Sequence, residues 1–192
     1  LSAYMTAQKL TNVQEFACIL GKMRDYETHL QTSARTSHIK KHMPWLTKFY
    51  TARYHCVDSS TFKPHCTHRA RAVRLTPQNI TRLDPSASPL YVKRLETAPV
   101  YGYLDERGQL VATSGVGYLT KKSFSISYTE TKPDYRGRGI AKCLTSLACE
   151  PLIKMGLIGA YAADATNQPS LGVAKGLGFK PYCDLKCFHN CE

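Results

Sequence analysis

The sequence has no long apolar run and no low-complexity composition. The best apolar stretch, Met155 to Ala163, contains glycine and is far shorter than the roughly 18 residues that a membrane-spanning helix requires. The 12 glycines and 10 prolines among 192 residues are too few for a collagen-like or disordered chain. No internal repeat and no run of like charge is found. We therefore expect a globular protein with no membrane partner.

Acidic residues are scarce. The chain has 14 Asp and Glu against 26 Lys and Arg, so its formal net charge is +12. A charge of this sign favours partners that carry negative charge, such as nucleic acid, anionic headgroups or phosphate-bearing small molecules. A soluble protein with a solvated basic surface remains the alternative.

Eight cysteines are too few for a small disulfide-stapled scaffold of this length. Cys18, Cys143 and Cys149 lie in apolar patterns, where buried reduced thiols are the usual case. Reduced thiols favour a reducing compartment, and no signal-peptide pattern opens the chain, so we expect a cytoplasmic protein.

The chain divides by composition near residue 70. Apolar spacings of three and four predict helices within Tyr4–Ser37 and over Met43–Tyr54, followed by an irregular linker from Asp58 to Thr67. We therefore expect a helical extension over residues 1–69 and a second domain over 70–192. Oligomeric state is open, with a homodimer as one expectation.

Strands and helices alternate unevenly over residues 70–192. Strands are expected at Ala70–Leu75, Val100–Leu104, Leu110–Tyr118, Ser123–Thr131, Leu157–Ala163 and Phe179–Phe188. Helices are expected from Thr76-Pro77 to about Leu83, and at Leu90–Leu95, Arg136–Met155 and Pro169–Leu177, with Pro151 kinking or cutting the third. Asp105 to Gly108 reads as a hairpin turn. The order predicts an α+β fold with a mixed sheet, not a doubly wound one.

The strongest local signal is Thr131-Lys-Pro-Asp-Tyr-Arg136-Gly-Arg-Gly-Ile-Ala-Lys142, between a strand and an amphipathic helix. A helix start exposes unpaired N–H groups and the positive end of the helix dipole, which together suit a phosphate or pyrophosphate. Gly137 and Gly139 would let a ligand approach the main chain. A plain structural turn is the alternative, and the pattern is neither a dinucleotide-binding fingerprint nor a P-loop.

Two motifs resemble one known family. Arg136-x-x-Gly139-x-Ala141 is similar to the acetyl-CoA motif of the GNAT superfamily of N-acetyltransferases. Downstream, Asn167-Gln-Pro-Ser170 and Leu177-Gly-Phe179 resemble that family's second motif, and the variant is most similar to the subgroup related to glycine N-acyltransferases. The resemblance implies the GNAT fold over residues 70–192, a twisted, mostly antiparallel mixed sheet flanked by helices.

The resemblance also implies a cosubstrate and its binding residues. Acetyl-CoA, or another short acyl-CoA, would be held by three groups of residues. These are the strand end Thr129, Glu130 and Thr131; the turn and helix start Arg136, Gly137, Arg138, Gly139, Ile140, Ala141 and Lys142; and, downstream, Asn167 and Ser170.

The sequence departs from the family at the catalytic positions. Many GNAT enzymes use a Glu base and a Tyr acid, and the equivalent positions here are about Ser125, Ala162 and Ala174, none of which can transfer a proton. Catalytic candidates are Glu130, Asp164 and Tyr182; Tyr128 and Tyr161 also border the expected cleft. Direct attack in a ternary complex, a water relay or an already neutral amine remain open.

Two groups of Cys and His residues are candidate metal ligands. One comprises His55, Cys56, His65, Cys66 and His68; the other comprises Cys183, Cys187, His189 and Cys191. Their spacings match no familiar zinc module, and burial of small thiols explains them equally well, so no metal site is assigned.

The expected function is an acyl-CoA-dependent N-acyltransferase that acetylates a primary amine. The acceptor could be a small molecule, a protein, or tRNA or DNA carrying the amine, and the net charge favours acidic acceptors. The alternative is a GNAT-fold module that has lost catalysis and serves binding or regulation, including binding of nucleic acid.

Overall fold

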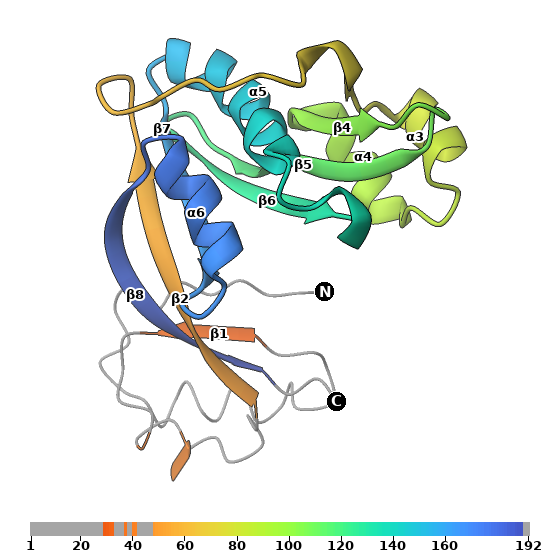
Figure 1. Ribbon diagram of the computed structural model, residues 1–192. Helices are drawn as coiled ribbons and strands as arrows, with labels where there is room; N and C mark the ends of the chain where they lie inside the picture. Colours follow the sequence, from red (N-terminus) through yellow and green to blue (C-terminus); the bar gives the residue numbers. More distant parts are fainter. Residues whose placement is uncertain (1–28, 33–36, 38–39, 42–47, 190–192) are drawn as a thin grey trace. The chain divides into compact units, whose positions relative to one another are not determined.

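The structure is a computed structural model that describes residues 29–32, 37, 40–41 and 48–189, and it divides into two compact units (Figure 1). Unit 1 comprises Leu1–Tyr54, Ala163–Asn167 and Tyr182–Glu192; unit 2 comprises His55–Ala162 and Gln168–Pro181. The predicted boundary between residues 69 and 70 stays a prediction. No helix in the described part of the chain is long and apolar enough to cross a bilayer.

Unit 2 contains most of the predicted sheet, in the strand order β7-β6-β5-β4-β3. Neighbouring strands are antiparallel except for β6 and β7, which are parallel. The strands are β3 (Ala72–Arg74), β4 (Val100–Leu104), β5 (Leu110–Leu119), β6 (Ser123–Thr131) and β7 (Ile158–Asp164), the last extending into unit 1. The helices are α3 (Pro77–Leu83), α4 (Pro89–Thr97), α5 (Ile140–Lys154) and α6 (Gln168–Gly176), with 3-10 turns η1 (Arg69–Arg71) and η2 (Pro133–Tyr135). The α+β prediction is confirmed.

Local signals place the first two helices where they were expected. Thr76 caps α3 with a reciprocal capping box, since its hydroxyl accepts from the Asn79 N–H while the Asn79 side chain accepts from the Thr76 N–H. Ser88 caps α4 by accepting from the N–H of Tyr91. Both helices have proline in the first turn, where the missing N–H is not needed. Gly108 has φ 74° in the β4–β5 hairpin, which explains glycine at that position.

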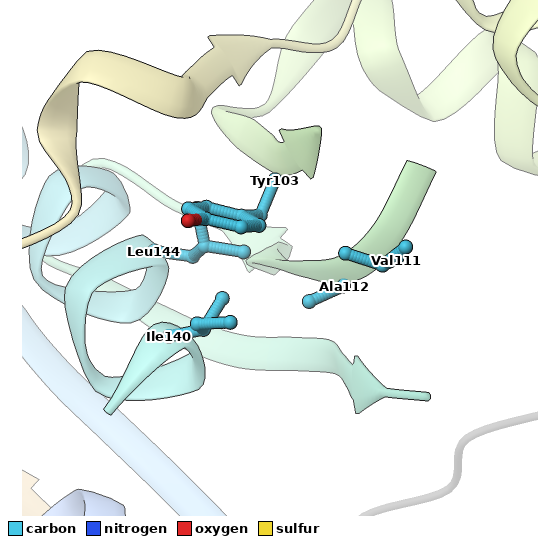
Figure 2. Close-up of a cluster of buried hydrophobic side chains, with 5 residues drawn as sticks. All are labelled: Tyr103, Val111, Ala112, Ile140 and Leu144. Carbon is cyan, nitrogen blue, oxygen red and sulfur yellow. The ribbon is translucent and has the colours of Figure 1, made fainter. Parts of the chain in front are cut away.

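Helices cover both faces of β4 and β5. Tyr103 packs with Ile140 and Leu144 of α5 on one face, in a buried cluster that also includes Val111 and Ala112 (Figure 2). On the other face, Val100 packs with Leu75, Ile80 of α3 and Leu95 of α4. Val100 and Tyr103 lie on opposite faces because side chains alternate along a strand. The start of α5 is therefore fixed against the middle of the sheet.

Helix α5 begins at Ile140 rather than at Arg136, and it continues through Pro151 to Lys154. Of the two expected effects of Pro151, a kink or a cut, the cut is not found. Leu152 and Ile153, which follow the proline, are both buried. Their burial stabilises the last turn and offsets the hydrogen bond that proline cannot donate.

Unit 1 contains strands β1 (His29–Thr32), β8 (Lys180–His189) and β2 (Lys48–Val57), in the order β1-β8-β2. The first residues of β8 and the last of β2 extend into unit 2. β1 pairs with β8 in antiparallel register, from His29 opposite His189 to Thr32 opposite Lys186. Within unit 1, Arg53 forms a two-pronged ion pair with Asp184, with N–O distances of 3.0 and 2.9 Å.

The predicted helical extension is wrong at His29–Thr32 and from Lys48 onward, whereas Ser37, Lys40 and Lys41 are helical. Residues from Lys48 onward form β2 rather than the end of a helix over Met43–Tyr54, and His29–Thr32 form β1 within the expected first helix. The segment Lys48–Val57 is rich in aromatic and β-branched residues, which favour an extended chain once a neighbouring strand pairs with it. The remainder of the expected helix over Tyr4–Ser37 falls almost entirely outside the described residues.

Candidate functional site

The turn before α5 exposes main-chain donors. Gly139 is the N-cap of α5 in the left-handed conformation, with φ 77°, and Gly137 has φ 75°. No side chain caps the helix start, so the N–H groups of Ile140, Ala141 and Lys142 have neither an intrahelical partner nor a side-chain cap. The dipole of this 15-residue helix adds positive potential at the same place.

Three cationic side chains surround this turn. Arg136 donates from Nε to the carbonyl of Thr131 at 2.9 Å, and Arg138 donates to the carbonyl of Asp134 at 2.7 Å. Because both guanidinium groups are held by main-chain oxygens, their charge is not neutralised there by a carboxylate. The Lys142 side chain runs beside Gly176 of α6, where a Cβ would lie 3.0 Å from its Cδ. We call the segment Arg136–Lys142 the α5 cradle.

Strands β6 and β7 separate beside the cradle. Their parallel pairing runs from Ser123 opposite Ile158 to Ile126 opposite Tyr161, while β6 continues to Thr131. The β7-facing main chain of the last β6 residues therefore has no β7 partner. The Oγ1 of Thr131 is also buried without a hydrogen-bond partner among the described residues. The strand end Thr129–Thr131 lies where the sequence motif predicts it.

A chain of three hydroxyl groups in unit 2 connects α5, β5 and β6. Thr145 donates to the carbonyl of Ala141 at 2.8 Å, and Ser114 lies 2.7 Å from Thr145 and 2.9 Å from Thr129. Because each hydroxyl has one proton and a carbonyl only accepts, Ser114 donates to Thr145 and Thr129 donates to Ser114. Sequence reasoning missed Ser114 and Thr145; two hydroxyl residues within apolar segments were the available signal.

Tyr161 of β7 contacts α6. Its hydroxyl oxygen lies 2.9 Å from the Oγ of Ser170. Burial is the main cause that raises the pKa of Tyr161, which is 2% exposed. Ser170, a predicted cofactor residue, is thereby in contact with Tyr161.

The three catalytic candidates fall in different units. Glu130 is exposed on β6 in unit 2 and lines a cavity of about 540 Å³. Asp164 and Tyr182 belong to unit 1, as does the cofactor candidate Asn167, so a shared site for these residues and the α5 cradle stays a prediction. The Thr166 hydroxyl and N–H donate to Asp164 at 2.6 and 2.7 Å and lower the pKa of that carboxyl group. A lowered pKa makes Asp164 a weaker base.

The segment from Asp58 to Arg71, which we call the strap, includes the expected irregular linker Asp58–Thr67 and is hydrogen-bonded to α5 and its neighbours. Lys63 donates from its N–H to the carbonyl of Leu177, and His65 from its N–H to Ser146 Oγ, both at 2.9 Å. His68 Nε2 donates to the carbonyl of Arg138 at 2.7 Å. Burial, then the charges of Lys142 and His68, lower the pKa of His65.

The two Cys/His groups do not gather in the described part of the chain. Within it, no three His, Cys, Asp or Glu side chains lie close enough together to hold a metal ion. Cys191 falls outside that part. Cys66 instead lies against Cys143 of α5, with the two Sγ atoms 2.7 Å apart.

Comparison with known proteins gives the same fold and a family. Residues 101–188 match the family described as GNAT acetyltransferase. No curated protein sequence matches the chain. The glycine N-acyltransferase-like subgroup stays a prediction, because the match is to the broader family.

Several solved structures are similar to this chain. One is an acetyltransferase of the GNAT family from Novosphingobium aromaticivorans, with TM-score 0.64, 18% identity, and coverage of 85% of this chain and 73% of that one. A GCN5-related N-acetyltransferase-like protein from Streptococcus suis has TM-score 0.62, 19% identity and coverage of 84% and 70%. A tandem GNAT protein from the clavulanic acid biosynthesis pathway has TM-score 0.61, 15% identity and coverage of 91% and 67%.

These likenesses are at low identity and concern the fold, whereas the sequence motifs and the family match concern the residues around the α5 cradle. The strand, glycine-rich turn and helix predicted from Thr131 to Lys142 are all present. Residues 101–188 are thus similar to the GNAT acetyltransferase family, and the chain shares its fold with solved GNAT structures.

Proposed function

We propose that this protein is an acyl-CoA-dependent N-acyltransferase that transfers the acetyl group of acetyl-CoA to a primary amine, by direct attack while both substrates are bound. The observation that supports it most directly is the α5 cradle, with uncapped N–H groups at a helix start and Arg136, Arg138 and Lys142 around them. The match of residues 101–188 to the GNAT acetyltransferase family supports acyl transfer in general. Cytoplasmic location and dimer formation stay predictions.

The cradle fits the pyrophosphate of CoA. A pyrophosphate needs several donors in a small space and positive potential, and the start of α5 offers both. The unpaired edge of β6 beyond Ile126 offers main-chain groups to the amide-containing arm of the same molecule. When bound, acetyl-CoA supplies the thioester that the amine attacks.

Glu130 is the best placed of the predicted bases. It lies in the same unit as the cradle, and its side chain forms no ion pair or hydrogen bond with other described residues. We propose that its carboxylate accepts the proton of the attacking amine. Asp164 is the weaker base, because its hydrogen bonds hold its pKa below the ordinary value.

The test is calorimetric titration of the protein with acetyl-CoA at two salt concentrations. The double variant Arg136→Glu/Gly139→Asp places negative charge in the cradle and should abolish binding. Arg107→Glu is the control, because Arg107 is exposed in the β4–β5 hairpin and its replacement changes the net charge by the same amount as Arg136→Glu. At the higher salt concentration, where long-range charge effects are screened, this variant should bind acetyl-CoA like the wild type. Binding that survives the double variant would contradict the cradle.

Turnover is tested separately with primary amines, by following release of the CoA thiol. Release that depends on the amine and falls at least about tenfold in Glu130→Gln supports the proposed role of Glu130. Acetyl-CoA binding without turnover of any amine would instead favour a non-catalytic GNAT module.

A further inference from the structure

The cavity beside Glu130 differs in charge from the whole chain. It holds about 540 Å³ and is formed by the α3–α4 loop, α4, β5 and β6 of unit 2. Two carboxylates, Asp84 and Glu130, line it against one ammonium group, Lys132. The cavity lining thus carries a net negative charge on a protein of net charge +12.

From this contrast we infer that the acceptor is a cationic amine with a flat apolar body, of the arylalkylamine class, and not an acidic molecule. This inference rests on the proposed function and names its second substrate. The cavity, its aromatic wall and its charge each support it.

One carboxylate oxygen of Asp84 is available to bind a ligand. Its Oδ1 accepts from the N–H and the hydroxyl of Ser86 at 3.1 and 2.6 Å. These two bonds fix the carboxylate at the C-terminal end of α3, while no described residue donates to Oδ2. A fixed carboxylate with an available oxygen is suited to bind an ammonium group.

Two tyrosines form an aromatic wall of the cavity. The rings of Tyr91 and Tyr128 have centroids 5.0 Å apart and an interplanar angle of 62°. Tyr128 is the only described residue other than glycine with positive φ, at 56°, in the part of β6 that lies beyond its pairing with β7. The strained backbone there places an aromatic ring at the cavity. Aromatic faces attract cations and stack against flat apolar groups.

The cavity also contains a donor without a partner. The hydroxyl of Tyr91 is buried and has no hydrogen-bond partner among the described residues. Apolar side chains complete the lining, namely Leu83, Ala87, Leu110, Val111 and Ala112. An acceptor with an apolar body, one positive charge and a group that accepts from Tyr91 would satisfy all of these features.

The experiment uses two amines of matched size, 2-phenylethylamine and phenylalanine. Both have the same ring and amino group, but phenylalanine adds a carboxylate that would face Asp84 and Glu130. With saturating acetyl-CoA, kcat/KM for 2-phenylethylamine should exceed that for phenylalanine by at least about tenfold. Binding of each amine is also measured without acetyl-CoA by ligand-observed NMR.

Asp84→Asn removes the charge and retains an oxygen that accepts from Ser86. It should raise KM for 2-phenylethylamine about tenfold, with little change in kcat and none in the Kd of acetyl-CoA. Glu96→Gln is the matched control, because Glu96 is exposed on α4, does not line the cavity and loses the same charge. It should match the wild type in every measurement.

The outcomes separate the two hypotheses. Equal or better use of phenylalanine, or an unchanged KM in Asp84→Asn, would overturn the cationic acceptor while leaving the acyltransferase in place. If acetyl-CoA fails to bind, the proposed function falls, and the NMR measurement still decides which amine the cavity prefers. Binding of 2-phenylethylamine that weakens in Asp84→Asn and not in Glu96→Gln supports the inference in either case.

Discussion

The Sγ atom of Cys66 in the strap lies 2.7 Å from the Sγ atom of Cys143 in α5. Cys143 is fully buried, and Cys66 is half-buried. The two cysteines are 77 residues apart in sequence, so the contact links the strap to the helix that begins at the α5 cradle. Burial, and then the hydrogen bond with Cys143, raise the pKa of the Cys66 thiol to about 12.

Oxidised glutathione should convert this pair to a disulfide. The two thiols lose their hydrogens, and glutathione disulfide is reduced to two glutathione thiols. Closing a loop of this length stabilises the folded state by up to about 4 kcal/mol, so the thermal midpoint should rise. Because the thiolate is the reactive form and the pKa is about 12, the rate should rise nearly tenfold per pH unit between about pH 7 and 9.

Mass spectrometry and thermal unfolding check this prediction. Cys66→Ser should lose both the mass change of two hydrogens and the rise in midpoint. Formation of only mixed disulfides with glutathione, at an unchanged midpoint, would show that the pair does not close.

Replacing Gly139 by alanine should weaken acetyl-CoA binding more than it weakens the fold. The left-handed backbone costs alanine about 1–2 kcal/mol, and the added Cβ would meet only His65 Nε2, at 3.8 Å. The same Cβ would project where a pyrophosphate must approach the main chain, so the Kd should rise at least about tenfold. Urea unfolding and calorimetry measure the two effects.

Gly172→Ala is the control for the cost to stability. Gly172 is helical in α6, and a Cβ there would meet nothing within 4 Å. Alanine should therefore stabilise the protein by about 0.5–1 kcal/mol, since glycine is the weaker helix former. Destabilisation of similar size in both variants would mean that the conformation of Gly139 is not the cause.

Gly115→Ala should be strongly destabilising because two strands approach closely there. A Cβ on Gly115 would lie 2.5 Å from Val100 Cα and 2.7 Å from the carbonyl oxygen of Pro99, and these backbone atoms cannot rotate away. We expect a loss of about 3 kcal/mol in the free energy of unfolding. Gly102→Ala would meet the ends of the Leu110 and Leu75 side chains, which can move, so it should lose clearly less. A smaller loss in Gly115→Ala than in Gly102→Ala would argue against the β4–β5 register.

Elements with local signals could be predicted from the sequence. The Thr76-Pro77 start of α3, the Asp105–Gly108 hairpin and the glycine-rich start of α5 each depend on residues close together in the chain. Strand β2 was mistaken for a helix because spacings of three and four among its aromatic residues also fit one helix face. Only pairing with a strand from the far end of the chain decides between the two.

The missed features of the site are all formed by distant residues. The strap depends on Ser146, Leu177 and Cys143, none of which a local pattern near residue 65 could indicate. The cavity charge likewise combines Asp84 after α3 with Glu130 on β6. Composition averages over the whole surface and cannot indicate the charge of one cavity.

Tyr161→Phe should lower stability by an amount that shrinks as pH rises above 10. At pH 8 the variant removes the hydrogen bond between Tyr161 and Ser170, which costs about 1 kcal/mol. The pKa of Tyr161 is raised by burial above the ordinary value of 10. The neutral hydroxyl therefore contributes stability below pH 10 that is lost as pH rises through the folded-state pKa, because the unfolded chain ionises first. Phenylalanine has no such loss, so the difference in free energy of unfolding between the two proteins, measured by urea unfolding, should be smaller at pH 10.5 than at pH 8.

Tyr182, which is 75% exposed, provides the control: Tyr182→Phe should leave the free energy of unfolding unchanged at both pH values. A difference for Tyr161→Phe that stays constant with pH would show that burial does not raise the pKa of its hydroxyl.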